Sequence, residues 1–236
     1  MISIITVVYN GEKTIRQTLD SVCNQSVLPD EYIIVDGLSS DSTLTIVRKY
    51  MEKYPFIKLI SEKDDGIYDA MNKGIKLAKG KLIGIINSDD WYEANAFEKM
   101  SEAFIENGSG VYYGIMRNIL NEKEFYLERV NQEFLAQKMI QHPSTFVSAD
   151  IYRDYGLFDL NYKISSDLEL FIRYSINNVK FYHLDNIIAN FRLGGASSTP
   201  KAGMESILIR KNYGLITVKQ YYFKLFKFKV KSFLNY

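Results

Sequence analysis

The stretch LIGIINSDDW, residues 82–91, contains the pattern on which the predicted fold depends. A short apolar run, residues 82–86, is typical of a strand buried on both faces of a parallel sheet, and the polar cluster Asn87-Ser88-Asp89-Asp90 follows it directly. In an open parallel sheet, ligands bind beyond the carboxyl ends of the strands. Two adjacent carboxylates repel each other unless a cation lies between them, and hard divalent cations prefer such oxygens. The stretch therefore predicts a buried strand that ends in a polar, metal-assisted binding site.

Similar strand patterns precede this one and alternate with helical patterns. The predicted strands cover residues 2–9, 32–36 and 58–60, and the predicted helices lie within 15–23, 44–54 and 67–78. Strands separated by single helices imply right-handed crossovers and a parallel sheet. We therefore predict an α/β protein with a Rossmann-like, mostly parallel sheet flanked by helices. From about residue 111 the alternation fades, and 165–174 is the clearest helical stretch that follows.

Composition and missing motifs exclude several classes of protein. Hydrophobic residues make up 47% of the 236 residues and aromatic residues 14%, which disfavours disorder. Cys23 is the only cysteine, so a disulfide scaffold is excluded and a Cys/His zinc site fails. The chain has neither G-x-G-x-x-G after the first strand nor G-x-x-x-x-G-K-[ST], which disfavours dinucleotide enzymes and P-loop NTPases. It also lacks the G-x-S-x-G nucleophile elbow of hydrolases.

The net charge of +1 is the sum of two unequal parts. Residues 201–236 hold eight bases and a single acid, Glu205, a net of +7, whereas residues 1–200 hold 21 bases and 27 acids, a net of −6. The sequence thus predicts an acidic body and a basic, amphipathic C-terminal tail. Within the tail, Phe226-Lys227-Phe228-Lys229 alternates as an edge strand would, while Phe223, Phe226, Val230 and Phe233 have the spacing of an amphipathic helix.

The basic aromatic tail suits either an anionic membrane surface or a nucleic acid. An acidic body would repel a nucleic acid and no nucleic-acid module is present, so we expect no such partner. The chain begins without a signal-peptide pattern and has no apolar run of about 20 residues. We therefore expect a cytoplasmic protein, peripheral on the inner face of the membrane if the tail binds lipid. Truncation after about Gly203 would then weaken liposome binding more than activity on a soluble acceptor.

Several segments, in this order and spacing, resemble the family 2 glycosyltransferases of bacterial surface-polysaccharide type, which have the GT-A fold. The more specific ones are TVVYN (6–10), IVDG (34–37), SDST (40–43), DGIYDAMNKG (65–74) and NSDDW (87–91). The looser ones are HPS (142–144), GLFD (156–159), SSDLE (165–169) and GGAS (194–197). The resemblance covers roughly residues 1–200. It implies a donor-binding half over 1–110 and an acceptor-side half over 111–200, with residues 201–236 as the separate tail.

The resemblance implies a nucleotide-diphosphate sugar as donor and assigns residues to it. Val7, through its backbone, and Tyr9 would hold the base at the end of the first strand. Asp36 would hydrogen-bond the base or the ribose. Asp65 matches a position near the nucleotide, although it could equally cap the helix that follows.

The same resemblance implies a divalent metal ion, Mn²⁺ or Mg²⁺, held against the diphosphate by Asp89 and Asp90. Asp89 would contact the donor as well. These acids correspond to the acidic end of the family's D-x-D element, and Asn87 replaces its first acid. An amide oxygen can still contact ribose or a metal-bound water, so this departure predicts weaker metal binding than in relatives with both acids.

Inversion at the anomeric carbon requires a base, and the resemblance assigns that role to Asp167. The alternative is an acid that stabilises the N-terminus of its own helix. His142, which precedes Pro143, could line the acceptor site, reach the metal or be structural. Trp91 could be a platform for a sugar or part of the core.

The function predicted from the sequence is an inverting, metal-dependent glycosyltransferase of hexosyl or N-acetylhexosaminyl type. It would move a sugar, most readily from a UDP-sugar, to a glycan or lipid-linked acceptor in surface polysaccharide synthesis. A non-catalytic nucleotide-sugar-binding or membrane-tethered scaffold protein is the alternative, which Asn87 supports. A nucleotidyltransferase is a third possibility, disfavoured because the first strand is not followed by a glycine-rich loop.

Overall fold

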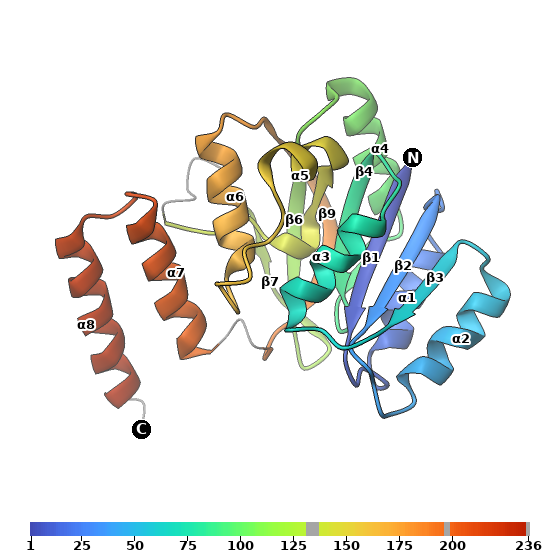
Figure 1. Ribbon diagram of the computed structural model, residues 1–236, viewed down its shortest axis with the longest axis horizontal. Coiled ribbons are helices and arrows are strands. Elements are labelled where there is room, and N and C mark those ends of the chain that lie inside the picture. The colour runs from blue at the N-terminus through green and yellow to red at the C-terminus, as the bar shows by residue number, and fades with distance from the viewer. Residues whose placement is uncertain (131–136, 196–198, 235–236) are drawn as a thin grey trace.

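The computed structural model describes residues 1–130, 137–195 and 199–234, and of these it gives the backbone alone for 228–234. The described strands form a nine-stranded sheet in the order β3-β2-β1-β4-β8-β6-β9-β5, with β7 paired to β6 (Figure 1). The strands are β1 (Ile2–Val8), β2 (Glu31–Asp36), β3 (Ile57–Ser61), β4 (Leu82–Asn87), β5 (Trp91–Tyr92), β6 (Val111–Leu120), β7 (Lys123–Glu128), β8 (Thr145–Ser148) and β9 (Phe181–Arg192).

The first four strands are parallel and end at one edge of the sheet. In their registers Val8 lies opposite Asp36, Val7 opposite Asn87, and Asp36 opposite Ser61. Strands β6 and β9 are parallel to each other, and the short β8 joins them to β4 by antiparallel pairing on both sides. The sheet is therefore mostly parallel, and the polar residues after β1, β2 and β4 share one edge, as the sequence predicts.

Helices cover both faces of the sheet because the strand side chains alternate. The side chains of Ile4, Ile34 and Ile86 lie on the face of the sheet that α1, α2 and α4 cover (Figure 1). Those of Ile5 and Ile33 lie on the opposite face, which α3, α5 and α6 cover. Two apolar cores result, one on each face. The helices are α1 (Ile15–Cys23), α2 (Thr43–Lys53), α3 (Ile67–Leu77), α4 (Ala96–Asn107), α5 (Ala149–Tyr155) and α6 (Ser166–Ile176), and a short 3-10 helix, η2, covers His142–Ser144.

The basic C-terminal segment has two structurally different parts. Helix α7 (Pro200–Asn212) packs on the body: Ile209 is fully buried in the core beside α6, and the guanidinium of Arg210 donates to the carbonyl oxygen of Lys138 at 3.2 Å. Helix α8 (Val218–Leu234) lies at the edge of the molecule beside α7 (Figure 1). The tail is thus helical, and a truncation after Gly203 would remove part of the core.

Helix α8 exposes large apolar side chains. Tyr222 and Phe226 are 65% and 67% exposed, and Lys219, Lys224 and Lys227 are exposed on the same helix. The side chains from Phe228 onward, including those of Val230 and Phe233, lie outside the described residues. Within the described part of the chain, no helix combines the length and the hydropathy that a membrane-spanning segment needs.

Candidate active site

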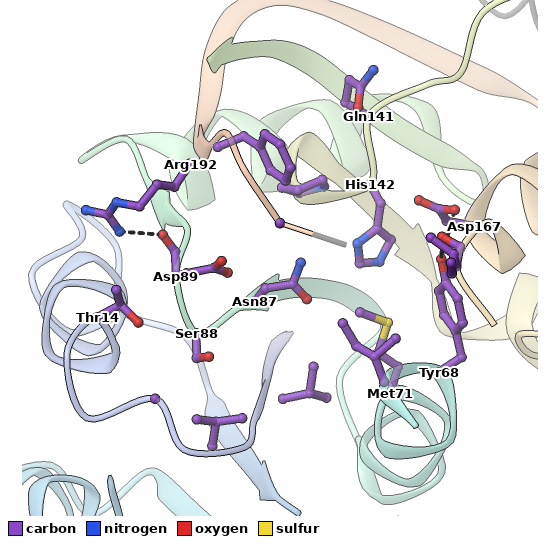
Figure 2. A pocket seen from close by; sticks show the side chains of 18 of the residues that line it. Thr14, Tyr68, Met71, Asn87, Ser88, Asp89, Gln141, His142, Asp167 and Arg192 are labelled. Atoms are coloured by element: carbon purple, nitrogen blue, oxygen red, sulfur yellow. Dashed lines mark hydrogen bonds between the residues drawn. The ribbon is translucent and has the colours of Figure 1, made fainter. Parts of the chain in front are cut away.

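A cavity of about 870 Å³ opens at the carboxyl edge of β1 and β4. Its walls come from the ends of these strands, the start of α3, the start of α6, the β6–β7 hairpin, η2 and the end of β9. Chemically active side chains line it from distant parts of the sequence, among them Tyr9, Asp64, Asn87, Asp89, His142, Lys163, Asp167 and Arg192. Figure 2 shows Asn87, Asp89, His142, Asp167 and Arg192 around the cavity.

Val7 and Tyr9, to which the resemblance assigns the base, both line this cavity. Val7 is buried at the end of β1, and Tyr9, just beyond it, is 66% exposed. Gly37 lies close to this end, where a Cβ atom would come within 2.6 Å of Asp64 Oδ2 and 3.5 Å of the Tyr9 ring. A side chain at position 37 would therefore force the carboxylate of Asp64 to move. An exposed aromatic ring beside a carboxylate is a suitable wall for a flat, hydrogen-bonding ligand.

The two acids assigned to the nucleotide both lie outside the cavity lining, but their surroundings differ. Asp36 is fully buried at the end of β2, where its Oδ2 accepts hydrogen bonds from Ser39 N at 3.0 Å and Ser61 Oγ at 2.7 Å. Its Oδ1 is buried and has no hydrogen-bond partner among the described residues. Asp65 is exposed outside the cavity lining, and no side chain caps α3 at Gly66, so Asp64 occupies the position in the cavity instead.

Of the adjacent acids after β4, Asp89 lines the cavity together with Asn87 (Figure 2). Burial raises the pKa of the Asp89 carboxyl above its ordinary value. A bound cation would act in the opposite direction, because it favours the charged carboxylate. The amide nitrogen of Asn87 contacts Asp90 Oδ2 at 3.4 Å, which leaves Asn87 Oδ1 buried and without a partner among the described residues.

Asp90 points away from the cavity into the body of the protein. It is fully buried, its Oδ1 accepts the backbone N–H of Arg192 at 2.9 Å, and its own carbonyl oxygen accepts from Thr18 Oγ1 at 2.7 Å. Burial, followed by the neighbouring charge of Asp89, raises the pKa of Asp90 well above its ordinary value. The geometry gives Asp90 a structural role, which is to join the end of β9 to the end of β4.

Trp91 also lies outside the cavity lining. It belongs to β5, where it pairs with Asn190 of β9, and the guanidinium carbon of Arg192 lies 5.0 Å from the centroid of its ring. Its ring thus packs against a cation of the cavity wall, which leaves the predicted contact with an acceptor sugar without structural support.

Arg192 is a residue of this site that the sequence pattern did not single out. It donates to the carbonyl oxygen of Asp89 at 2.7 Å (Figure 2). It also donates to Gln17 Oε1 at 2.8 Å and forms an ion pair with Glu122 at 3.2 Å. Arg192 and Lys163 are the two bases among the described residues that line the cavity. Arg192 therefore places positive charge directly beside Asp89.

Asp167 lies in the first turn of α6 and faces the cavity (Figure 2). Its Oδ1 accepts hydrogen bonds from Tyr68 Oη at 3.0 Å and from Leu168 N at 2.9 Å. Burial raises its pKa to about 6, although these two hydrogen bonds favour the charged form. Glu169, two residues later, faces the other way and pairs with Arg173 at 2.9 Å. Asp167 is therefore a cavity carboxylate with the pKa expected of a general base near neutral pH.

His142 lies between Asn87 and Asp167, with its imidazole ring pointing into the cavity (Figure 2). The residue is 6% exposed, and its ring packs edge-on against Phe158 with the centroids 5.6 Å apart. Burial lowers its pKa to about 4, so the imidazole is neutral at pH 7. A neutral imidazole can donate one hydrogen bond and accept another, which suits contact with a polar ligand.

Asn87 at the end of β4 and Asp89 just beyond it fit a divalent cation only as part of a shared site. Asp89 offers a carboxylate and Asn87 a buried amide oxygen without a partner. No cluster of three or more His, Cys, Asp or Glu side chains suited to a metal ion occurs in the described ranges. A hard cation takes six or more oxygens, so a ligand rich in oxygen must complete the shell. The donor set thus suits Mg²⁺ or Mn²⁺ held jointly by the protein and a diphosphate.

Solved structures share this architecture. TarS 1–349 of S. aureus in complex with UDP-GlcNAc superposes with a TM-score of 0.74 and 21% identity, over 94% of this chain and 69% of that chain. The mannosyltransferase PcManGT from Pyrobaculum calidifontis, solved in complex with GDP-Man and Mn²⁺, gives a TM-score of 0.71 and 14% identity, over 88% and 62%. At these identities the likeness shows the fold alone, which is GT-A.

Sequence relatives extend the likeness beyond the fold. Chondroitin synthase of Escherichia coli is 28% identical over 207 residues, which are 85% of this chain and 30% of that protein. The chain thus spans less than a third of the length of this larger synthase. A PGL/p-HBAD biosynthesis glycosyltransferase of Mycobacterium tuberculosis is 31% identical over 211 residues, which are 84% and 80% of the two chains. The model of the family described as Glycosyl transferase family 2 matches residues 3–203, so the chain belongs to that family of glycosyltransferases.

Proposed function

We propose that this protein transfers a sugar, with inversion, from a UDP-sugar to a hydroxyl group of a glycan or lipid-linked acceptor during polysaccharide synthesis. The observation that carries the proposal is the arrangement of one cavity. It has Asp89 with Asn87 on one wall and Asp167, a carboxylate with a pKa of about 6, on another. A nucleotide site and a base facing a common space are what a displacement at an anomeric carbon requires.

The uridine would lie at the end formed by Val7 and Tyr9. Asp36 is the last residue of β2 and directly precedes Gly37, and its Oδ1 is a buried carboxylate oxygen without a donor among the described residues. An N–H group of a pyrimidine base would supply that donor, and leaving the oxygen unpaired costs about 1–3 kcal/mol. The ring of Tyr9 offers the base a face to stack on.

Asp89 and Asn87 would hold a Mn²⁺ or Mg²⁺ ion against the diphosphate, and the ion would stabilise the charge that develops on the leaving nucleotide. Arg192 lies beside Asp89 and adds a fixed positive charge on the same side. Both groups would therefore favour departure of UDP and leave the proton chemistry to the opposite wall.

Asp167 would take the proton of the acceptor hydroxyl. Its Oδ1 already accepts from Tyr68 and Leu168, so Oδ2 is the oxygen available for this transfer. As the acceptor O–H bond breaks, the acceptor oxygen bonds to the anomeric carbon. The bond from this carbon to the diphosphate breaks at the same time. The products are the inverted glycoside, UDP and protonated Asp167, which loses its proton to water.

Incubation with a panel of UDP- and GDP-sugars and Mn²⁺, with glycan and lipid-linked acceptors, tests the proposal. We expect release of UDP that depends on both metal and acceptor, and NMR of the glycoside should show inverted anomeric configuration. If no sugar nucleotide binds or turns over, or if the configuration is retained, the proposal is wrong.

The same assay separates the alternative functions. Metal-dependent UDP binding without turnover on any acceptor would favour a non-catalytic nucleotide-sugar-binding scaffold, for which Asn87 in place of an acid is the supporting feature. Release of pyrophosphate instead of UDP would indicate a nucleotidyltransferase.

We also propose that the protein works in the cytoplasm, with α8 peripheral on the anionic inner face of the membrane. Exposed Tyr222, Phe223 and Phe226 would enter the lipid interface, and the exposed lysines of the helix would contact acidic headgroups. Such a contact would hold the cavity near a lipid-linked acceptor.

Truncation after Thr217 tests this contact because it removes α8 and keeps α7 in the core. We expect loss of binding to phosphatidylserine-containing liposomes and unchanged turnover of a soluble acceptor. Replacing Lys219, Lys224 and Lys227 together with glutamine should weaken that binding on the order of 100-fold, at about 1 kcal/mol for each charge. Equal binding of both variants and the intact chain to anionic liposomes would refute the proposed contact.

A further inference from the structure

We infer that Glu205 of α7 is a positioning residue for sugar transfer, because its carboxylate fixes the loop that presents Asp167 to the acceptor. The inference rests on the proposed role of Asp167 as the base. Glu205 is the only acid among residues 201–236, where it stands among eight bases. It therefore differs in charge from the rest of its own segment.

The carboxylate of Glu205 accepts hydrogen bonds from three consecutive backbone N–H groups. Its Oε1 accepts from Lys163 N at 2.8 Å, and its Oε2 accepts from Ile164 N at 2.8 Å and from Ser165 N at 2.6 Å. These groups immediately precede α6, whose N-terminal end carries a partial positive charge. Ser165 Oγ also donates to the carbonyl oxygen of Ala202 at 3.3 Å, so α7 holds the loop at two points.

This loop determines how Tyr68 interacts with Asp167. Tyr68 Oη lies 2.7 Å from the carbonyl oxygen of Ile164 and 3.0 Å from Asp167 Oδ1. A phenol has one proton to donate, so the two acceptors compete for it. Because Glu205 fixes the N–H group of Ile164, it also fixes the residue whose carbonyl is the competing acceptor. A shift of this loop would change both the position of Asp167 and the hydrogen bond that Tyr68 donates to it.

The charge of Glu205 acts on Asp167 directly as well. Burial is the main cause of the raised pKa of Asp167, and the negative charge of Glu205 raises it further. Tyr68 of α3 is the titratable group that bonds to Asp167, and the neutral His142 of η2 lines the same cavity. The charged side chains that line this cavity with Asp167 are Asp64, Asp89, Glu128, Lys163 and Arg192. Removing the charge of Glu205 should therefore lower the pKa of Asp167.

Glu205→Gln tests the inference because it keeps the size of the side chain and one acceptor oxygen. We expect about a tenfold loss of kcat, a donor KM within about twofold of the intact protein, and an acid limb of the kcat–pH profile displaced to lower pH. Glu205→Asp keeps the charge, so it should return the acid limb toward its original position even if kcat recovers only in part.

Ser206→Ala is the matched control on the same helix. Ser206 belongs to α7, and its Oγ accepts a hydrogen bond from Arg210 at 2.6 Å. Within the described part of the chain it makes no hydrogen bond with residues 163–165. We expect a lower melting temperature for this variant, with kcat and the acid limb unchanged. If Glu205→Gln behaves in the same way, Glu205 only stabilises the fold and the inference is wrong.

A second measurement does not depend on activity. Titration of ¹³C-labelled aspartate carboxyl groups by NMR, with the Asp167 signal assigned by its absence in Asp167→Asn, reports the pKa of Asp167 in the intact protein and in Glu205→Gln. An unchanged pKa overturns the electrostatic part of the inference. An intact protein that is inactive on every donor overturns the proposed function instead, and the NMR comparison still decides whether Glu205 and Asp167 are coupled.

Discussion

The two walls of the cavity are held in place by different interactions. The donor wall includes the carboxyl ends of β1 and β4, which a backbone ladder aligns with Val7 opposite Asn87. A second ladder holds β1 to β2, with Val8 opposite Asp36. The catalytic wall depends on side-chain hydrogen bonds between distant segments, such as those from Tyr68 Oη to Asp167 and from Ser165 N to the carboxylate of Glu205. Substitutions in the donor wall should therefore remove local contacts, whereas single substitutions in the catalytic wall should also alter its geometry.

Asp167→Asn should have the largest effect, because it removes the only proton acceptor assigned to the reaction. We expect kcat to fall about 10³-fold, since general-base catalysis contributes roughly 10²–10⁴ in rate. The donor wall is not affected, so the dissociation constant for UDP should stay within about twofold. Steady-state kinetics together with calorimetry of UDP binding give both values.

The exposed acid Asp154 of α5 supplies the control for this substitution. It pairs with its neighbour Arg153 at 2.7 Å. Asp154→Asn should leave kcat and UDP affinity unchanged. Loss of UDP affinity in Asp167→Asn would instead make Asp167 a donor-binding residue. The assignment of donor binding to one wall and proton transfer to the other would then be wrong.

Asp89→Asn should have the next largest effect, and this effect should be on donor binding instead of on proton transfer. The substitution removes the carboxylate that faces the cavity, and charge-assisted contacts contribute about 1.5–3 kcal/mol, so we expect donor affinity to fall about 10- to 100-fold at a fixed Mn²⁺ concentration. Raising the metal concentration should restore part of it. Donor affinity that is insensitive to both the substitution and the metal would contradict the proposed role of Asp89.

Asp90→Ala should mainly affect stability. It leaves the backbone N–H of Arg192 without its acceptor, at a cost of about 1–3 kcal/mol in the free energy of unfolding. For a chain of this length the melting temperature should fall roughly 3–10 °C. Calorimetry checks this value, and donor affinity should change less than in Asp89→Asn. The opposite ranking of the two variants would mean that Asp90 is the residue that meets the donor.

The contrast between Asp89 and Asp90 shows what sequence spacing can predict and what it cannot. The run from Leu82 to Asp90 was enough to predict a buried strand and polar groups at its carboxyl end, and the structure has both. Spacing cannot decide which of two adjacent acids faces the cavity, since the turn after β4 points consecutive side chains in different directions. Asp64 and Asp65 differ for the same reason at the start of α3.

The sequence pattern does not predict which residues far apart in the chain are in contact. Arg192 reaches the carbonyl of Asp89 across 103 positions, and Glu205 reaches Ser165 across 40. Each is a charged residue in a segment without local periodicity that would distinguish it, so only the folded chain identifies its partner. The lone acid in a basic segment was the one available signal for Glu205. The tail was predicted as a unit from its charge, whereas the burial of Ile209 joins α7 to the core.

The smallest predicted effect is on the pH dependence of kcat, and it tests the hydrogen bond from Tyr68 to Asp167 in the catalytic wall. Asp167 is active as the unprotonated carboxylate, so kcat should be lost as the pH falls through about 6. The hydrogen bond from Tyr68 favours the charged form of Asp167 and thus lowers its pKa. Tyr68→Phe should therefore move the acid limb to higher pH, the opposite of Glu205→Gln, with little change in kcat on the plateau.

Tyr174→Phe removes a similar buried hydroxyl, bonded to the carbonyl of Gly156 at 2.7 Å, and should leave the limb in place. If Tyr68→Phe and Glu205→Gln move the limb in the same direction, loop displacement dominates over charge and hydrogen bonding at Asp167.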